Sequence, residues 1–274
     1  MVPTQMPIEA QEIERLADLI LSASSQLKPI TDARPSFDLA GAYRVSAAIT
    51  RRRVARGENP VGWKIGFTNS ALWAEQGLDS PIWAPMYDKT VAAADAGASV
   101  DMTMLSEPRI EPEIGLRLAR VPTPEMDEPA LLACIDGVTH GFEIVQSIYP
   151  GWKLKPADAV AAFGMHALYR YGPIVPIAEA DRARWLKMLV EFTVVLFRDG
   201  VEMDRGVGSN VLGGPLSALR YFVSGARKYP GYELKAGDLI TTGTLTKALP
   251  IKRGETWSTE ISGIPLPPMK VTLT

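Results

Sequence analysis

Three glutamates in two apolar segments form the strongest chemical signal of this sequence. Glu111 and Glu113 flank Pro112, and side chains two residues apart on a strand point to the same face, a few ångströms from each other. Glu143 stands alone in a second apolar segment, where an ionised carboxylate needs a partner or a raised pKa. One divalent cation would satisfy all three carboxylates. Because hard ions prefer oxygen ligands, such a cation would be Mg²⁺ rather than Zn²⁺.

Spacing alone leaves a second interpretation open for these glutamates. Glu111 and Glu113 could lie on a solvated strand face, while Glu143 pairs with a lysine or an arginine. Pro112 adds a constraint, because proline cannot donate a hydrogen bond to a β-ladder. The strand that contains it is therefore expected at a sheet edge or at a bulge, where side chains are often turned toward a site.

The composition narrows the classes of protein and partner. Hydrophobic residues make up 46% of the 274 residues and charged residues 22%, as in an ordinary globular chain. The 29 Lys and Arg nearly balance the 31 Asp and Glu, and no basic tract exceeds the run 51–53, so nucleic acid is not an expected partner. The sequence has no run of 18 apolar residues and no signal-like start. We therefore expect a soluble, cytoplasmic protein with no membrane partner.

The single cysteine, Cys134, excludes an internal disulfide and a multi-cysteine zinc site. It lies within the apolar run 130–135. We expect a buried small hydrophobic residue here rather than a nucleophile.

Two amphipathic helices are expected at the N-terminus. Apolar positions recur at three- and four-residue steps from residue 8 to about residue 26, and a second helix is expected from about residue 38 to residue 55. We predict that residues 1–60 form an N-terminal helical cap. Further helices are expected after Asp127 and over residues 215–228, where each start carries an early proline.

Short apolar runs punctuated by glycine and proline dominate after residue 60 and are expected to be strands. The runs are 61–68, 110–118, 141–148, 189–197, 239–242 and 269–273. Asp199 and Gly200 both tolerate positive φ and predict a hairpin turn. Because helices do not alternate regularly with these strands, a parallel doubly wound sheet and an eightfold α/β barrel are disfavoured. We predict an α+β fold with a mixed or antiparallel β core.

Several ordered motifs give the chain a resemblance to a known family. They are the segments 62–69, 108–114, 142–145, 213–216 and 234–238, the last of which leads to 242–245. Over roughly residues 60–274 the sequence resembles the 2-hydroxypentadienoate (2-keto-4-pentenoate) hydratase and 4-oxalocrotonate decarboxylase branch of the fumarylacetoacetate hydrolase superfamily. The resemblance implies a β-roll or barrel-like catalytic domain at residues 61–274, of the fumarylacetoacetate hydrolase C-terminal-domain type.

The resemblance also assigns roles to individual residues. It makes Glu111, Glu113 and Glu143 the ligands of Mg²⁺ or Mn²⁺. Lys64 would lie at the substrate, where apolar neighbours could lower its pKa toward the range useful for proton transfer, or where it could hold the substrate carboxylate. An ordinary surface lysine is the alternative. Asp79 is the second catalytic candidate.

Departures from the family pattern fall around the expected pocket. Ile82 stands where the family has an acid expected to manage a water or a proton, and polar residues of two later segments are replaced by apolar ones. These changes imply a less charged or bulkier substrate. The expected substrate-binding residues, each of which could instead be core or plain turn, are Lys64, Trp83, Trp152, Phe163, Met165 and Thr244.

His140 and His166 are the only histidines in the chain. An imidazole titrates near neutral pH, so either of them could replace the missing acid. The family has no histidine at these positions, and we therefore favour a hydrogen-bonded structural role for both.

The resemblance implies a hydro-lyase similar to 2-keto-4-pentenoate hydratase, acting on a small 2-oxo acid in the breakdown of aromatic compounds. Water would be added or removed through a metal-stabilised enolate. A decarboxylase or a C–C bond hydrolase could use the same enolate, and Ile82 favours decarboxylation because that reaction needs no activated water. A catalytically quiet metal-binding subunit of an oligomer is a third possibility. The family also implies a homo-oligomer.

Overall fold

Two long helices precede the first strand of the structure, a computed structural model that describes residues 8–31, 37–94 and 97–274. α1 (Ala10–Ser25) and α2 (Leu39–Ala55) begin and end within two residues of the predicted boundaries. The carboxylate of Asp38 accepts a hydrogen bond from the backbone N–H of Gly41 at 2.7 Å, which satisfies one donor of the first turn of α2.

The division of the chain at residue 60 stays a prediction. α1 and α2 do end before the first strand begins at Pro60, but their buried side chains belong to the same hydrophobic cluster as those of the strands and later helices. Residues 1–7 and 32–36 of the predicted cap lie outside the described residues.

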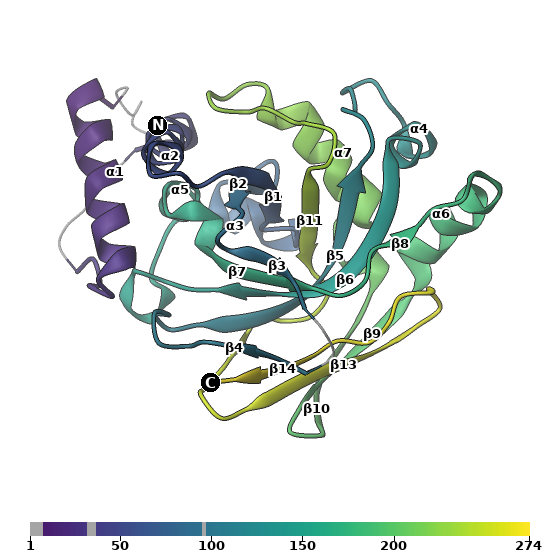
Figure 1. The fold of residues 1–274 in the computed structure, drawn as a ribbon. Coiled ribbons are helices and arrows are strands. Elements are labelled where there is room, and N and C mark those ends of the chain that lie inside the picture. The colour runs from purple at the N-terminus through teal and green to yellow at the C-terminus, as the bar shows by residue number, and fades with distance from the viewer. Residues whose placement is uncertain (1–7, 32–36, 95–96) are drawn as a thin grey trace.

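A large mixed sheet of nine strands dominates the described residues. Its main path runs β2-β1-β11-β5-β6-β7-β3, while β12 pairs with β5 and β8 pairs with β6. The sheet bends into a half-barrel (Figure 1), as the predicted mixed, barrel-like core requires. The bounds are β1 Pro60–Gly66, β2 Ile82–Tyr87, β3 Val91–Ala93, β5 Arg109–Leu118, β6 Ile135–Val145, β7 His166–Tyr171, β8 Val175–Pro176, β11 Leu239–Thr244 and β12 Leu249–Pro250.

A second sheet of five strands lies against one end of the first, below it in Figure 1. Its order is β10-β9-β13-β14-β4. The predicted turn at Asp199 and Gly200 joins β9 to β10, and both residues have positive φ, 50° and 80°. The bounds are β4 Ala98–Val100, β9 Thr193–Arg198, β10 Val201–Val207, β13 Thr256–Ser262 and β14 Lys270–Leu273.

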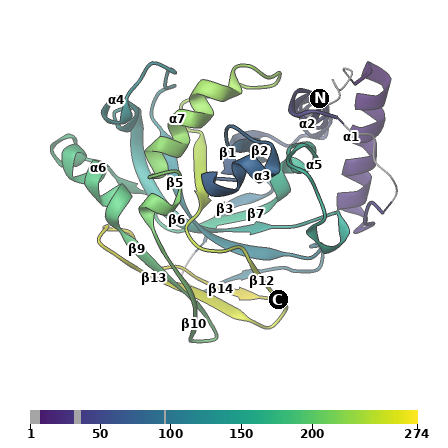
Figure 2. The same cartoon turned by 180° about the vertical axis from the view of Figure 1, so that it is seen from behind.

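Five shorter α-helices belong to the described fold, and α4, α6 and α7 gather at the other end of the large sheet from the second sheet (Figures 1 and 2). The bounds are α3 Trp73–Gln76, α4 Glu128–Leu132, α5 Pro156–Ala161, α6 Arg182–Glu191 and α7 Pro215–Ala226. Pro215 opens α7, where a missing N–H removes no helical hydrogen bond.

Alternation along β5 and β6 separates the core from the face that carries polar chemistry. Ile110 and Ile144 pack in a core with Trp257 of the second sheet, while Ile114 lies in the core shared with the helices. Because side chains alternate along a strand, the odd-numbered positions of β5, which include Glu111, point to the opposite face. The two cores therefore hold the backbone that positions the glutamates.

Two expectations about local structure were wrong in part. Of the run 189–197, the first three residues end α6, and the strand begins only at Thr193; Leu189 is buried one helical turn after the buried Trp185, a spacing that a short apolar run conceals. The strand of Pro112 is not at an edge, because β5 lies between β6 and β11. The expected irregularity is instead in β11, whose register with β5 shifts between Thr241 and Thr244.

Two remaining expectations concern the burial of Cys134 and membrane-spanning helices. Cys134 is fully buried and belongs to no disulfide, as predicted. Within the described ranges, no helix combines the length and apolar character that a membrane span requires.

Candidate metal and substrate site

Glu111, Glu113 and Glu143 converge on one face of β5 and β6. In the antiparallel register Glu111 lies directly opposite Glu143, and Glu113 lies opposite Gly141. Opposed residues on one face have Cβ atoms about 4.5–5.5 Å apart. One carboxylate oxygen of each glutamate lies within 4.8 Å of those of the other two. The alternative of a solvated strand face does not fit Glu113, which is fully buried. Its other part, a pairing of Glu143 with a lysine, does occur, because Glu143 Oε2 lies 3.3 Å from Lys64 Nζ.

Each buried glutamate is held by a specific partner. Glu113 Oε2 accepts a hydrogen bond from the backbone N–H of Gly243 at 2.9 Å. Gly243 has φ of +109°, and a Cβ there would lie 2.4 Å from the hydroxyl of Thr68, so the irregularity in β11 requires glycine. Glu143 Oε1 lies 2.8 Å from Nδ1 of His166. Glu113 Oε1 has no hydrogen-bond partner in the described part of the chain, whereas Glu143 Oε2 faces the ammonium of Lys64 at 3.3 Å.

The electrostatics of the three carboxyl groups reflect their crowding. Burial, reinforced by Glu143 and Glu111, raises the pKa of Glu113 well above its usual value. Burial, opposed by the Lys64 ammonium and reinforced by Glu143, raises the pKa of Glu111 to about 7. The pKa of Glu143 shifts in the opposite direction. Burial alone would raise it, but the charge of Lys64 and the hydrogen bond with His166 outweigh burial and lower this pKa. Three acids, two of them fully buried and one half-buried, share one strong cationic partner, which leaves a deficit of positive charge.

Lys64 is the cation of this cluster. It extends from β1, is almost fully buried, and places Nζ 3.3 Å from Glu143 Oε2. Burial disfavours the ammonium, but the charges of Glu143, Glu111 and Glu113 more than compensate, so the pKa of Lys64 is raised. The expected fall in this pKa is therefore wrong for the side chain in these surroundings, because apolar neighbours were considered without the three acids.

A tight turn holds Lys64 from the other side. The three residues of this turn, Phe163, Gly164 and Met165, have positive φ between 60° and 65°. Residues other than glycine rarely adopt this region. The turn presents the carbonyl oxygen of Gly164, which accepts a hydrogen bond from Lys64 Nζ at 3.0 Å. A Cβ on Gly164 would lie 2.9 Å from Cδ of Lys64. Backbone and lysine therefore fit closely.

Both histidines are buried and hydrogen-bonded at each ring nitrogen. His140 contacts the carbonyl of Glu113 at 3.1 Å and the hydroxyl of Thr259 at 2.9 Å, and burial lowers its pKa to about 4. His166 contacts Glu143 and the hydroxyl of Thr90. The structural role favoured from the sequence agrees with these contacts, and His166 in particular orients a glutamate of the cluster.

A pocket of about 870 Å³ opens beside the glutamates. Of the expected substrate-binding residues, Lys64, Trp152, Met165 and Thr244 line it. The hydroxyl of Thr244 donates to the carbonyl of Thr246 at 2.9 Å. The expected acid Asp79 is exposed and is not among the lining residues that the structure describes.

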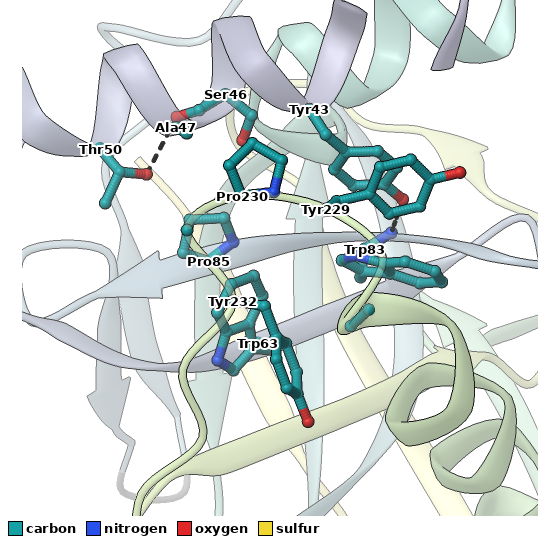
Figure 3. A pocket seen from close by; sticks show the side chains of 12 residues that line it. Tyr43, Ser46, Ala47, Thr50, Trp63, Trp83, Pro85, Tyr229, Pro230 and Tyr232 are labelled. Carbon is teal, nitrogen blue, oxygen red and sulfur yellow. Dashed lines mark hydrogen bonds between the residues drawn. The ribbon is translucent and has the colours of Figure 1, made fainter. Parts of the chain in front are cut away.

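Trp83 and Phe163 also lie outside this pocket wall. Trp83 is buried in an aromatic cluster where α2, β1, β2 and the segment after α7 meet (Figure 3). Its ring stacks on Tyr43 with centroids 5.2 Å apart, and the Tyr43 hydroxyl accepts a hydrogen bond from the Trp83 backbone N–H at 3.3 Å. The cavity there measures only about 10 Å³, about enough for one water.

We expect Trp83→Phe to lower stability without affecting the pocket. The smaller ring leaves part of the aromatic cluster unfilled, so the free energy of unfolding should fall by about 1–3 kcal/mol. Denaturant unfolding measures this change, and calorimetric titration with Mg²⁺ and a 2-oxo acid measures the pocket. A selective loss of 2-oxo acid affinity with unchanged stability would instead support the substrate-binding role expected from the sequence.

Arg109 also lines the pocket, although no role was expected for it from the sequence. A signal for it was present, because Arg109 precedes Glu111 by two residues on the same strand and must share its face. The contribution of the Gly243 N–H had no comparable signal, since it depends on the register shift in β11.

Comparisons with known proteins agree with one another. A family model described as fumarylacetoacetate (FAA) hydrolase C-terminal matches residues 71–272. A 2-keto-4-pentenoate hydratase of Paraburkholderia xenovorans (strain LB400) is 28% identical over 267 residues, which cover 96% of this chain and 94% of the relative. A 4-oxalocrotonate decarboxylase of Pseudomonas sp. (strain CF600) is 29% identical over 237 residues, covering 86% of each protein.

A solved structure resembles the chain over nearly its whole length. It is 4-oxalocrotonate decarboxylase from Pseudomonas putida G7, complexed with magnesium and adipate. The TM-score is 0.88 at 28% sequence identity, and the match covers 98% of this chain and 100% of that one. The fold expected from the sequence is thereby confirmed.

Proposed function

The chain belongs to the fumarylacetoacetate hydrolase C-terminal family, and from this premise we propose that it is a divalent-metal-dependent lyase acting on a small 2-oxo acid. The favoured reaction is the addition or removal of water, as in the 2-keto-4-pentenoate hydratases to which it is similar. One observation carries the proposal: three glutamates, two of them fully buried, converge beside a pocket large enough for such an acid.

The residues present fit a hard divalent ion. Three carboxylates offer only oxygen atoms, which Mg²⁺ and Mn²⁺ prefer. Glu113 Oε1 is buried and has no hydrogen-bond partner among the described residues, an arrangement that costs free energy unless a further partner is supplied. Glu111, Glu113 and Glu143 would hold the ion. The related decarboxylase was solved with magnesium, which supports this choice.

The bound ion supplies Lewis-acid stabilisation of negative charge on the 2-oxo oxygen of the substrate. The chain itself orients the ligands: the Gly243 N–H fixes Glu113, and His166 fixes Glu143. Lys64 holds a proton at Nζ beside the cluster and can transfer it to a substrate carbon or hydrogen-bond a substrate carboxylate. Met165 and Leu245 contribute apolar side chains to the pocket wall.

A second reaction, decarboxylation, is favoured by one position. Ile82 is buried on β2, and no acid stands there to handle a water. The proposed role of Asp79 as a second catalytic group draws no support from its exposed position outside the pocket wall, so the proton-transfer role rests on Lys64. Loss of carbon dioxide needs the same enolate and no activated water. C–C bond hydrolysis and a catalytically quiet subunit remain alternatives that the following experiment separates.

We expect chelation with EDTA to abolish turnover, and Mg²⁺ or Mn²⁺ to restore it. The test screens a panel of 2-oxo acids and their enols by loss of ultraviolet absorbance, with trapping of carbon dioxide; the panel includes 2-hydroxypenta-2,4-dienoate for hydration, 4-oxalocrotonate for decarboxylation and fumarylpyruvate for C–C bond hydrolysis. Independently of activity, Mg²⁺ should raise the melting temperature, because an ion that binds only the folded state stabilises it. Silence across a broad panel of 2-oxo acids, with a normal response of the melting temperature, would favour the quiet subunit.

We also propose that the protein is a cytoplasmic homo-oligomer in the breakdown of aromatic compounds. The support is the family relationship and the names of the relatives. Analytical ultracentrifugation of the full chain tests the oligomeric state.

A further inference from the structure

The basic run 51–53 at the end of α2 has two different surroundings. Arg51 and Arg52 form ion pairs with acids of α1, and the side chain of Arg51 is 65% exposed. Consecutive residues of a helix are turned by about 100°, so Arg53 leaves α2 on another side. Its side chain is only 13% exposed. The third arginine of the run therefore points into the protein rather than toward solvent.

Arg53 contacts two aromatic rings. Its guanidinium carbon lies 3.8 Å from the ring centroid of Tyr87 on β2 and 5.5 Å from that of Phe163, both within the range of a cation–π interaction. Two hydrogen bonds to Glu58, of 2.9 and 2.5 Å, hold the guanidinium. The hydroxyl of Tyr87 contacts that of Thr50 on α2 at 2.9 Å. Arg53 and the two rings thus connect α2 with β2 and with the segment after α5.

Phe163 begins the turn whose carbonyl anchors Lys64. Its φ is +60°, and a side chain in this left-handed region persists only when its surroundings determine it. At the other end of the turn, both the N–H and the carbonyl of Met165 are hydrogen-bonded to backbone groups. At the Phe163 end, the ring is in contact with Arg53. The conformation of the turn therefore depends in part on a side chain of α2.

We propose that Arg53 is a positioning residue for Lys64. Its guanidinium holds the ring of Phe163, the ring fixes the turn, and the turn presents the carbonyl that accepts from Lys64 Nζ at 3.0 Å. The inference rests on the proposed function, in which Lys64 transfers a proton. Arg53 is not among the described residues that line the pocket, so α2 contributes to the reaction without touching the substrate.

The effect on the rate follows from the sensitivity of proton transfer to position. A misplacement of about 1 Å can cost about 100-fold in rate. Without the cation, the ring of Phe163 loses one of its contacts, and the carbonyl that anchors Lys64 can shift. The three glutamates are held by other groups, the Gly243 N–H and His166, and should keep their positions.

Steady-state kinetics of the Mg²⁺-loaded protein with its best 2-oxo acid test the inference. Arg53→Met should lower kcat roughly 10- to 100-fold. KM should not change and Mg²⁺ binding should not weaken, because the loss falls on the transition state. Arg53→Lys keeps a cation beside the rings and should recover part of the loss. Arg51→Met, the matched control from the same run, should behave like wild type.

A second comparison separates positioning of Lys64 from general damage. In a Lys64→Met background, Arg53→Met should cause no further loss of kcat, because the group that Arg53 positions is already gone. Losses that simply multiply would overturn the inference, as would a wild-type kcat in Arg53→Met. If kcat, KM and Mg²⁺ affinity all deteriorated together, Arg53 would have only a structural role, and the inference would fail.

Crystal structures of the metal-free variants give a readout that does not depend on turnover. In Arg53→Met, Lys64 Nζ should have left the carbonyl of Gly164, whereas Arg51→Met should keep this contact. Phe163→Leu removes the other partner of the cation–π contact and should show the same displacement, which keeps the inference testable should Arg53→Met fail to fold. An intact contact in both Arg53→Met and Phe163→Leu would overturn the inference. A wild-type protein that turned over no 2-oxo acid would instead overturn the proposed function, and the crystal structures would then decide the role of Arg53 alone.

Discussion

Glu113→Gln should weaken Mg²⁺ binding by at least about 100-fold without destabilising the metal-free protein. The substitution removes one of three ionised oxygen donors, and changes around metal sites that are milder than the loss of a ligand already cost about 10- to 100-fold. The glutamine can keep the hydrogen bond from the Gly243 N–H. Burial and the neighbouring Glu143 and Glu111 raise the pKa of Glu113 in the native protein, and a neutral glutamine removes both unfavourable effects.

Glu143→Gln provides the contrast. It should weaken Mg²⁺ binding about as much as Glu113→Gln does, but it also removes the charged partner of the buried Lys64. Breaking a buried pair by removing one partner costs about 3–5 kcal/mol, so this variant should be clearly less stable without metal. Glu260→Gln, at an exposed position of β13, is the control. Calorimetry with Mg²⁺ and denaturant unfolding measure both effects, and retained Mg²⁺ affinity in Glu113→Gln and Glu143→Gln would remove the basis of the proposed chemistry.

Lys64→Met should lower kcat by roughly 10²- to 10⁴-fold, the usual contribution of a positioned acid or base. Mg²⁺ affinity should not fall, because the substitution removes a positive charge 3.3 Å from a glutamate oxygen. This combination separates a role in proton transfer from a role in metal binding. Steady-state kinetics and metal titration on the same preparation check it, with the exposed Lys252→Met as control. A kcat within twofold of wild type would exclude Lys64 as the proton-transfer group.

Much of the fold and of the glutamate cluster could be predicted because both follow from local periodicity. Helical spacing located α1 and α2, and two-residue alternation placed Glu111 and Glu113 on one face. That Glu143 lies opposite Glu111 depends on strand register, which no local pattern fixes. The family resemblance supplied this link. Register also decides which backbone N–H reaches Glu113, so Gly243 went unrecognised.

The less successful expectations concern residues whose surroundings come from distant segments. Trp83 was expected at the substrate because its neighbour Ile82 departs from the family pattern, but its ring packs against Tyr43 and Tyr229 from two other parts of the chain. The pKa of Lys64 was judged from its neighbours in sequence, whereas Glu143 of β6 decides its sign. The contact of Arg109 with the ring of Trp152 likewise joins residues far apart in the sequence, and no local pattern predicts it.

The turn formed by Phe163, Gly164 and Met165 links the stability of the protein to the position of Lys64. Two of its residues carry side chains in a left-handed conformation, and each such residue costs on the order of 1–3 kcal/mol. Replacing them by glycine would relax the chain and also loosen the carbonyl that anchors Lys64. Substitutions in this turn that raise thermal stability are therefore expected to lower catalytic activity, which is the general trade-off between stability and activity.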